Sequence, residues 1–483
     1  METIVSSTPG VAPGAPTGDA SGVAPDLSAL SSLRRWIALI VLMLVGAVVA
    51  LDMTLVNVAL PDITRSLHPS TSVMPWIVDA YTVAFCATLL IWGAIGDRWG
   101  RSRLIAVGLA IFTAGSLIAL ESSSTAALVA GRGVMGLGGA MLFPTTMGMV
   151  VALTNGAARA RAIAAFTAVM ALCTALGPVA GGYLVEHHGW RSIFSVTIPL
   201  TMVALPLVLW LLPLVRLDTW HPIDWLGAAL GATSLTAILI AITNATGDGW
   251  LRPEVLVPLG LGVLAMAGFA LQTRTTIHPI IPRGVVGRRG FIGPSSAVTL
   301  ANFGLNGGLY LLTLILQIRD GYSPLEAGVR TVPFALGMLV GSAFSETLAS
   351  RFGTRVTIAA GMLFSGIGLA AFGIIGGAYA PMAAAMILTA IGAGFAMPTA
   401  ATAILSAVPV DQAGSGSAID ETFQEVGAAF GVAVIASLAA NGENPLAHVP
   451  LATALAGIVL ALGAVLAWAL TPAGVLNTSE HAD

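Results

Sequence analysis

Long apolar segments recur along almost the whole chain, separated by short stretches that hold most of the charged residues. A helix that crosses the hydrocarbon core of a membrane needs roughly 20 mainly apolar residues. The pattern therefore predicts fourteen membrane-spanning helices, with twelve as the competing count. The predicted spans are residues 36–60, 75–95, 104–121, 125–153, 162–185, 191–213, 225–244, 254–272, 291–318, 326–348, 356–377, 381–408, 417–439 and 451–470. The division of residues 225–272 into two spans depends on the polar stretch from Asn244 to Glu254.

Two short motifs occur twice at nearly the same spacing. Arg98-Trp99-Gly100 recurs as Arg351-Phe352-Gly353. The segment GLGGAMLFP, which ends at Pro144, recurs more loosely as GAGFAMP, which ends at Pro398. The distance along the chain agrees within one residue, which indicates two homologous halves. Transporters are commonly built from such repeats, with the substrate site between them near the membrane midplane.

These patterns predict an all-α integral membrane protein with two pseudo-symmetric six-helix bundles plus two intervening helices, about fourteen transmembrane helices in all. We expect a disordered cytoplasmic tail at residues 1–34, an N-terminal six-helix bundle at 35–215 and two extra linker helices with cytoplasmic loops at 216–290. A C-terminal six-helix bundle at 291–470 and a cytoplasmic tail at 471–483 follow. Residues 1–33 carry no cation ahead of an apolar stretch, so they do not resemble a secretory signal.

Composition supports a membrane protein and excludes several other classes. Of the 483 residues, 56% are hydrophobic and 9% charged, whereas an ordinary soluble domain is about 25% charged. The net charge of −3, with no basic stripe, gives no reason to expect nucleic acid as a partner. The chain contains no lysine, which excludes ATP hydrolysis by a P-loop within it. The histidines fall in predicted loops or in the tail, so we expect no metal site and no cofactor.

The arginines indicate the orientation in the membrane. If the N-terminus is cytoplasmic, fourteen arginines lie in the predicted inner loops and five in the outer loops. Positive residues concentrate on the cytoplasmic side of membrane proteins. We therefore expect a multi-pass protein of the cell (cytoplasmic, inner) membrane with both termini in the cytoplasm.

Four motifs resemble those of the major facilitator superfamily, specifically its fourteen-span drug:proton antiporter branch. They are LDMTLVNVALP at residues 51–61, GAIGDRWGRSR at 93–103, GRGVMGLG at 131–138 and GPVAGG at 177–182. The segments WIVDAY at 76–81 and ETFQE at 421–425 are similar to the sub-branch that expels lipophilic cations and antiseptics. The chain departs from the family pattern at Met135, where glutamine is usual, and at Ser350, where the first half has Asp97.

The resemblance implies proton-coupled efflux of lipophilic, cationic drugs or antibiotics by alternating access, and no enzymatic activity. The implied partners are a small drug-like molecule, protons and membrane lipid, without ATP. Two alternatives remain within transport: export of a single endogenous metabolite or self-made antibiotic, and proton-coupled uptake. An intramembrane enzyme is disfavoured because no His–carboxylate metal motif and no Ser–His pair lies at membrane depth.

Asp52 and Arg132 are the strongest candidates for the proton-coupling site. Asp52 lies nine residues before Pro61, which places it roughly 13 Å below the predicted outer end of its helix. Arg132 lies at a similar depth, about 12 Å, in the fourth span. A carboxyl group at this depth must be neutral or paired. We therefore expect the two side chains to face each other and to separate during transport; a permanent structural bridge is the alternative.

Three further carboxylates are candidates. Glu421 and Glu425 are four residues apart and share one helix face, where both cannot be charged at low cost. Such a pair suits a cation or its exchange for protons, although Glu421 could simply complement the positive end of its helix. Asp79 lies one turn after Pro75, so the helix dipole also explains it; its match to the cation-exporter pattern favours a functional role.

The remaining candidates are concerned with conformational change. Gly93 and Gly100 allow tight turns and close approach of helices, and Asp97 can pair with Arg98 or Arg101 to hold the inner side closed. Fixing the topology is the alternative role of Arg101 and Arg103.

The segment from Gly177 and Pro178 to Gly181 and Gly182 interrupts and thins the fifth span. It could act as an antiporter hinge, or it could serve ordinary close packing.

Overall fold

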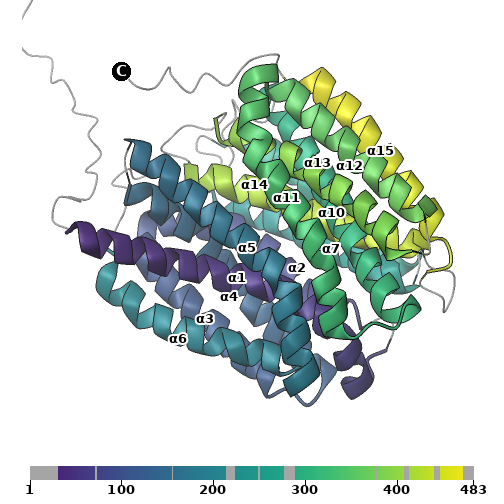
Figure 1. Ribbon diagram of the computed structural model, residues 1–483. Coiled ribbons are helices and arrows are strands. Elements are labelled where there is room, and N and C mark those ends of the chain that lie inside the picture. Colours follow the sequence, from purple (N-terminus) through teal and green to yellow (C-terminus); the bar gives the residue numbers. More distant parts are fainter. Residues whose placement is uncertain are drawn as a thin grey trace, which may run out of the picture.

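The computed structural model describes residues 31–70, 73–154, 156–213, 224–248, 251–276, 289–375, 378–406, 413–439 and 446–471. Within these ranges all regular structure is helical (Figure 1). The helices are α1 Ser32–Leu67, α2 Trp76–Trp99, α3 Arg101–Leu120, α4 Thr125–Ala152, α5 Gly156–His188, α6 Ser192–Leu211, α7 Trp225–Asp248, α8 Pro253–Thr275, α10 Arg289–Leu314, η2 Ile315–Arg319, α11 Pro324–Phe352, α12 Thr354–Ile375, α13 Tyr379–Ser406, α14 Ala413–Ala439 and α15 Val449–Leu470.

Twelve of the helices in the described ranges are long and apolar enough to cross a membrane, counting α10 and η2 together. Helix α2 adds a shorter apolar stretch, Trp76–Leu89. Helices α7 and α8 qualify separately, which confirms the predicted division of residues 225–272. The total of fourteen spans stays a prediction.

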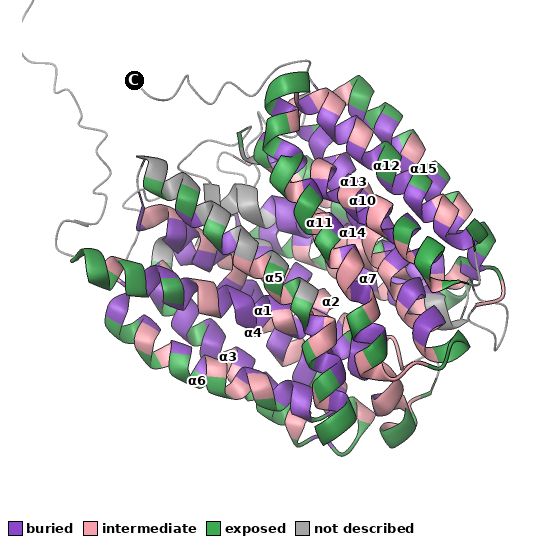
Figure 2. Ribbon diagram, in the orientation of Figure 1, coloured by how far each residue is buried: buried purple, intermediate pink, exposed green. Residues whose placement is uncertain are grey.

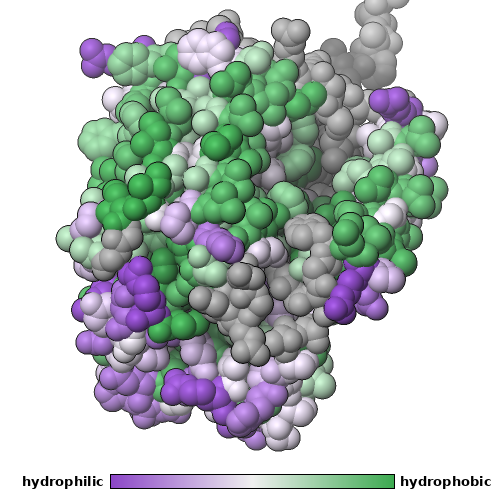
Figure 3. Space-filling view, turned by 90° about the vertical axis from the view of Figure 1, so that its right-hand side faces the viewer, coloured by the Kyte–Doolittle hydropathy of each residue, from purple (hydrophilic) through white to green (hydrophobic). Residues whose placement is uncertain are grey.

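Side chains that face outward are apolar, as contact with lipid requires. Leu264 of α8 is 72% exposed and Val465 of α15 is 67% exposed. Exposed positions concentrate on the outside of the helices (Figure 2). On the face shown in Figure 3, apolar side chains cover much of the upper part, and polar side chains gather at the lower end. Such a surface is stable only where hydrocarbon replaces water.

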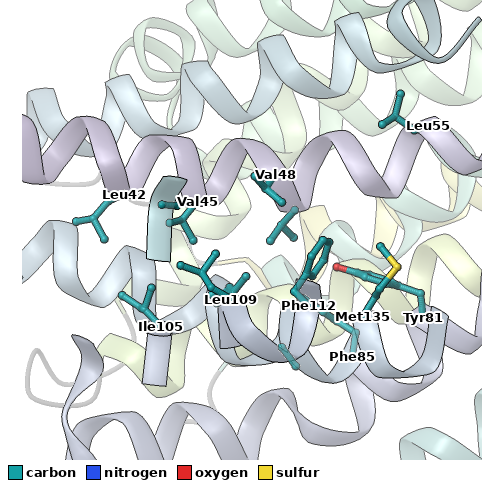
Figure 4. Close-up of a cluster of buried hydrophobic side chains, with 14 of the residues drawn as sticks. Leu42, Val45, Val48, Leu55, Tyr81, Phe85, Ile105, Leu109, Phe112 and Met135 are labelled. Carbon is teal, nitrogen blue, oxygen red and sulfur yellow. The ribbon is translucent and has the colours of Figure 1, made fainter. Parts of the chain in front are cut away.

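The helices surround two separate apolar cores. Buried side chains of α1–α6, with Leu239 of α7, form the first core, and those of α10–α15 form the second. In the first core, Val48 of α1, Phe85 of α2, Phe112 of α3 and Met135 of α4 point into the space between their helices (Figure 4). Burial of each such side chain contributes about 1.5–3 kcal/mol in a soluble protein, but against lipid the close fit matters more.

Glycines bring the same helix pairs into contact in both halves. A Cβ on Gly138 of α4 would lie 2.6 Å from the backbone nitrogen of Phe112 of α3. A Cβ on Gly392 of α13 would lie 2.5 Å from the backbone nitrogen of Ser365 of α12. These two contacts follow the spacing of the sequence repeat, and the two pairs of helices are equivalent.

The tight turns that follow α2 and α11 repeat as well. Gly100 ends α2 with φ 104°, and Gly353 ends α11 with φ 89°. Only glycine adopts this conformation readily, because it lacks a Cβ. The repeated Arg-aromatic-Gly motif thus has a backbone explanation at its third position.

Two details of the helices differ from the prediction. Pro61 lies inside α1, which continues to Leu67, so the C-terminal end of this helix is farther from Asp52 than predicted. Near the end of a helix the missing N–H of proline is tolerated, because water and the neighbouring chain can satisfy the freed carbonyl. His187 and His188, predicted in a loop, belong to the last turn of α5.

Helices α7 and α8 lie beside the two bundles. Helix α7 packs against α2 of the first bundle and α14 of the second, and α8 packs against α7. The bundles also meet directly, through α5 with α11 and through α2 with α14. Figure 1 shows α5 and α11 approaching each other where α5 ends and α11 begins.

Candidate functional site

Arg132 of α4 is buried at the centre of the first bundle and bonds to Asp52 of α1. Its Nη1 atom lies 2.6 Å from Asp52 Oδ2, and the two residues are only 1% and 2% exposed. Its Nε donates to the carbonyl oxygen of Ile77 in α2 at 3.2 Å. The prediction that Asp52 and Arg132 face each other is confirmed. Each charge is thereby paired, which is the condition for burying it at this depth.

Tyr81 of α2 completes the surroundings of the arginine. The guanidinium carbon of Arg132 lies 4.6 Å from the centre of the Tyr81 ring, an arrangement in which the ring stabilises the positive charge. The Tyr81 hydroxyl is buried and has no hydrogen-bond partner among the described residues. It lies against Gly139 of α4, where any side chain would collide with it. The ring is part of the apolar cluster with Phe112 and Met135 (Figure 4).

Asp79 lies close to Arg132's contact with α2 and bonds to a helix outside the first bundle. The hydroxyl of Thr243 in α7 donates to Asp79 Oδ2 at 2.7 Å. Asp79 also interacts electrostatically with Arg132. Arg132 therefore has two carboxylates in its surroundings, one bonded directly and one held by α7.

Glu421 and Glu425 lie on α14, in the second bundle, and interact electrostatically with each other. Glu421 is 8% exposed. Helix α14 packs against α2 of the first bundle. The acidic pair therefore lies on a helix at the interface between the two bundles. In a low dielectric two adjacent carboxylates cannot both be charged without a cation or a proton.

Asp420, next to Glu421, extends this acidic segment. Its Oδ2 accepts a hydrogen bond from Gln424 at 2.9 Å, while its Oδ1 is buried without a partner among the described residues. The described residues bring together no group of three or more His, Cys, Asp or Glu side chains that could hold a metal ion.

The predicted hinge in α5 lies between α1 and α11. Gly177 packs against Thr54 of α1, two residues after Asp52, and Gly181 packs against Leu55. On the other side, a Cβ on Gly182 would lie 2.6 Å from Leu325 Cα of α11. The segment therefore connects the helix that carries Asp52 to the second bundle.

The contact between α5 and α11 continues along both helices. The carbonyl of Pro178 lies against Gly328 of α11, where a side chain would collide with it. Near the ends of the helices, the hydroxyl of Ser323 donates to Glu186 Oε2 at 3.1 Å. This seam combines close backbone packing with one exposed hydrogen bond.

The predicted gating loop is described in part. The side chains of Asp97 and Arg98 lie outside the described residues. Gly93 is buried within α2, and Gly100 makes the turn into α3. Arg101 Nη1 donates to the carbonyl oxygen of Gly148 near the C-terminal end of α4 at 2.6 Å. A cation at that end of a helix is favourable because the carbonyl dipoles point toward it.

A central cavity near Asp52, Arg132 and Glu425 was expected. A cavity of about 380 Å³ lies between α7 and α8, among residues such as Thr236, Ile240 and Leu261. In the conformation described, Asp52, Arg132 and Glu421 are buried, and Glu425 is partly exposed.

Sequence reasoning did not identify Tyr81, Thr243 or Gly148 as site residues. Tyr81 belongs to the motif WIVDAY at 76–81, and its position two residues after Asp79 was the feature of the sequence that could have indicated it. Thr243 and Gly148 carry no signal in the sequence, because their roles depend on contacts with distant helices.

Comparison with known proteins places the chain in a family. The Major Facilitator Superfamily profile matches residues 42–316 and again 292–481. The puromycin resistance protein pur8 of Streptomyces alboniger is 35% identical over 462 residues, which cover 90% of this chain and 91% of that protein. The multidrug efflux pump LfrA of Mycolicibacterium smegmatis is 31% identical over 412 residues, or 84% and 81% of the two chains. The tetracenomycin C resistance and export protein of Streptomyces glaucescens is 30% identical, covering 87% and 79%.

Solved structures agree at the level of the fold. The peptide transporter POT in complex with sulfate superposes with a TM-score of 0.66 at 16% sequence identity, covering 90% of this chain and 95% of that one. At this identity the likeness concerns the arrangement of helices alone. Together, the repeated profile match, the full-length relatives and the fold show that this chain is a multi-pass membrane transporter of the Major Facilitator Superfamily.

Proposed function

We propose that the protein exports lipophilic, cationic drugs or antibiotics across the cytoplasmic membrane in exchange for protons. The observation that carries this proposal is the buried ion pair between Asp52 and Arg132, whose atoms lie 2.6 Å apart. Helix α1, which carries Asp52, also contacts the predicted hinge of α5. A paired carboxylate in this position can change partner only if something else neutralises it. A proton is the smallest species that can do so.

The proposed cycle is alternating access between residues 35–215 and residues 291–470, with α7 and α8 attached at the side. A proton that binds Asp52 removes the charge to which Arg132 is bonded. The guanidinium then has to find another partner, because an unpaired buried cation costs several kcal/mol. The resulting shift of α1 acts on α5 through Thr54 and Gly177, and so on the seam between α5 and α11.

Substrate recognition is assigned to the acidic pair on α14. Glu421 and Glu425 lie on α14, which packs against α2 at the interface between the bundles. A lipophilic cation there would neutralise one carboxylate, and protons would displace it by neutralising both. Drug and proton therefore compete for the same charge, which is the physical requirement for exchange.

The orientation follows from the arginine distribution, with both termini in the cytoplasm. On that assignment the seam between α5 and α11 lies on the outer side of the membrane. Gly182, Gly328 and the Ser323–Glu186 hydrogen bond then close the outer exit. Closure of this seam supports an inward-open or occluded state, which would receive substrate from the cytoplasmic side.

Transport into everted vesicles tests the proposal. Acidifying the lumen should drive accumulation of a lipophilic cation such as ethidium, and collapsing both ΔpH and voltage should abolish it. Asp52→Asn should not accumulate the dye under either condition. Uphill accumulation that persists without any gradient, or accumulation driven by an acidic bath in place of an acidic lumen, would contradict export by proton exchange.

A second candidate is the export of one particular antibiotic. It is favoured by relatives that are named for single compounds, among them the puromycin and tetracenomycin C resistance proteins. A resistance panel in a pump-deficient host separates the two. Protection against many unrelated cations supports a broad pump, and protection against one compound supports a dedicated exporter.

A further inference from the structure

Two consecutive residues of α7 bond to the first turn of α2. The Thr243 hydroxyl donates to Asp79 Oδ2 at 2.7 Å, and Trp76 Nε1 donates to Asn244 Oδ1 at 3.3 Å. Thr243 is 3% exposed and Asp79 is partly exposed, so the bond between them is partly shielded from water. Hydrogen bonds to a charged group are shorter and roughly twice as strong as neutral ones.

This use of a threonine differs from that of others in the same fold. The hydroxyls of Thr88 in α2 and Thr389 in α13 donate to the carbonyl four residues earlier in their own helix. That local bond satisfies a hydroxyl in a membrane helix without any neighbour. The Thr243 hydroxyl also acts outside its own helix: it donates to a carboxylate of α2, 164 residues away along the chain.

The position of α7 gives the bond its importance. Helix α7 packs against α2, which carries Asp79, and against α14, which carries the acidic pair. Asp79 lies two residues after Ile77, whose carbonyl oxygen accepts a hydrogen bond from Arg132 Nε. The Thr243 hydroxyl therefore acts on a carboxylate in the segment of α2 that also binds Arg132.

We infer that Thr243 is a positioning residue of the transport site, which holds the Asp79 carboxylate in place and makes α7 part of the coupling machinery. This inference rests on the proposed function. When a proton neutralises Asp52, Asp79 is the other carboxylate in the surroundings of Arg132. The hydrogen bond from the Thr243 hydroxyl fixes the position of the Asp79 carboxylate, which would be this second partner of Arg132. Helix α7 is then more than a connection between the two halves.

Removal of the hydroxyl alone tests the inference. Thr243→Val keeps the shape of the side chain, and we expect a roughly tenfold fall in kcat/KM for proton-driven efflux, the size expected for one hydrogen bond to a charged group. Thr243→Ser restores the hydroxyl and should retain most of the transport. Thr236→Val, the same change on the side of α7 that faces the cavity with α8, serves as the control and should transport normally.

A double-mutant cycle with Asp79→Asn shows whether Thr243 acts through Asp79. If it does, Thr243→Val causes no further loss once Asp79 is Asn. Equal loss in both backgrounds, or failure of Thr243→Ser to restore transport, would show a packing role and overturn the inference. Thermal stability of each purified variant, measured in detergent, identifies any that are merely misfolded.

The same set of variants separates this inference from the function on which it rests. If Asp79→Asn impairs efflux and Thr243→Val does not, the role of Thr243 is wrong and proton exchange stands. If Asp79→Asn has no effect while Asp52→Asn abolishes efflux, neither Asp79 nor Thr243 belongs to the site. If efflux is independent of the proton gradient in the wild-type protein, the proposed function itself is wrong.

Discussion

A single buried arginine organises the candidate site at the scale of residues. Arg132 bonds to Asp52 and to the carbonyl oxygen of Ile77 and lies over the face of the Tyr81 ring, so that two helices, α1 and α2, stabilise the charge that α4 carries. A buried ion pair is weak evidence for stability, because the cost of desolvation offsets most of the attraction. Its presence is therefore better explained by function than by folding.

The first prediction separates these two contributions. Asp52→Asn removes the carboxylate bonded to Arg132 and should destabilise the protein by up to about 3–5 kcal/mol, the cost of a buried charge left wholly unpaired; a bond from Arg132 to Asp79 reduces that cost. The double variant Asp52→Asn with Arg132→Gln removes both charges and should recover most of that stability without recovering efflux. Thermal unfolding in detergent and vesicle transport measure the two effects. Efflux by the double variant would contradict the role of the pair.

A second prediction concerns the Tyr81 hydroxyl, which is buried without a partner among the described residues. Tyr81→Phe keeps the ring over Arg132 and removes only an unsatisfied polar group. Leaving such a group buried costs about 1–3 kcal/mol, so the variant should be at least as stable as the wild-type protein. Thermal unfolding of the purified variant checks this. Lower stability would show that the hydroxyl has a partner that the described residues do not reveal.

Depth along a helix was enough to predict the Asp52–Arg132 contact, because both residues interrupt apolar segments and lie at similar heights. The bond from Thr243 to Asp79 was not predictable. Thr243 is one of many threonines in apolar segments, and nothing in its local sequence indicates which helix lies beside it. The functional roles of all of these residues stay predictions.

At the scale of elements, glycines decide which helices touch. Gly328 of α11 faces the carbonyl of Pro178 in α5, and Gly182 faces the backbone at Leu325. The motif at 177–182 predicted close packing or a hinge in α5. It could not indicate α11 as the partner, because contacts between the halves are not encoded in either segment alone.

A third prediction tests this seam. Gly328→Ala places a methyl group against the Pro178 carbonyl and should force α5 and α11 apart. In a variant without Cys86 and Cys173, cysteines introduced by Glu186→Cys and Ser323→Cys should then form a disulfide at least several-fold more slowly. The matched control is Gly260→Ala, since a Cβ at Gly260 would meet nothing within 4 Å. An unchanged rate of disulfide formation would contradict closure by this contact.

The boundaries of the elements are harder to predict than their existence. The sequence pattern predicts the end of the first span near Pro61, whereas α1 continues to Leu67. A proline ends a helix reliably only where its neighbours cannot satisfy the freed carbonyl, and a sequence gives no information on those neighbours. The split between α7 and α8 was predicted correctly, because the polar stretch from Asn244 to Glu254 interrupts the apolar segment, although α7 itself continues to Asp248.

At the scale of the whole molecule, two similar bundles meet at two interfaces, one between α5 and α11 and one between α2 and α14. The extra pair, α7 and α8, lies beside the interface between α2 and α14. The repeat in the sequence predicted the two halves, and the glycine contacts of α4 and α13 follow the same repeat. The place of the extra pair could not be predicted, since the sequence gives its order along the chain and not its neighbours.

The fourth prediction concerns topology. In a cysteine-free variant, Leu251→Cys between α7 and α8 should react with a membrane-impermeant maleimide applied to intact cells, since Leu251 is 87% exposed. Ser31→Cys before α1 and Thr276→Cys after α8 should react only after the membrane is permeabilised. This outcome requires an even number of spans between Ser31 and Thr276. Labelling of Thr276→Cys but not Ser31→Cys in intact cells would contradict the even count, and labelling of both would contradict the orientation.

The backbone contact between α3 and α4, and its counterpart between α12 and α13, restrict how the protein can deform. Where a peptide group of one helix occupies the space of a missing side chain on the other, sliding by a fraction of a turn brings a bulkier residue into that space and meets hard repulsion. Little elastic energy can therefore be absorbed inside either half. A displacement that begins at one buried group is passed on almost undiminished to the surfaces where the halves meet.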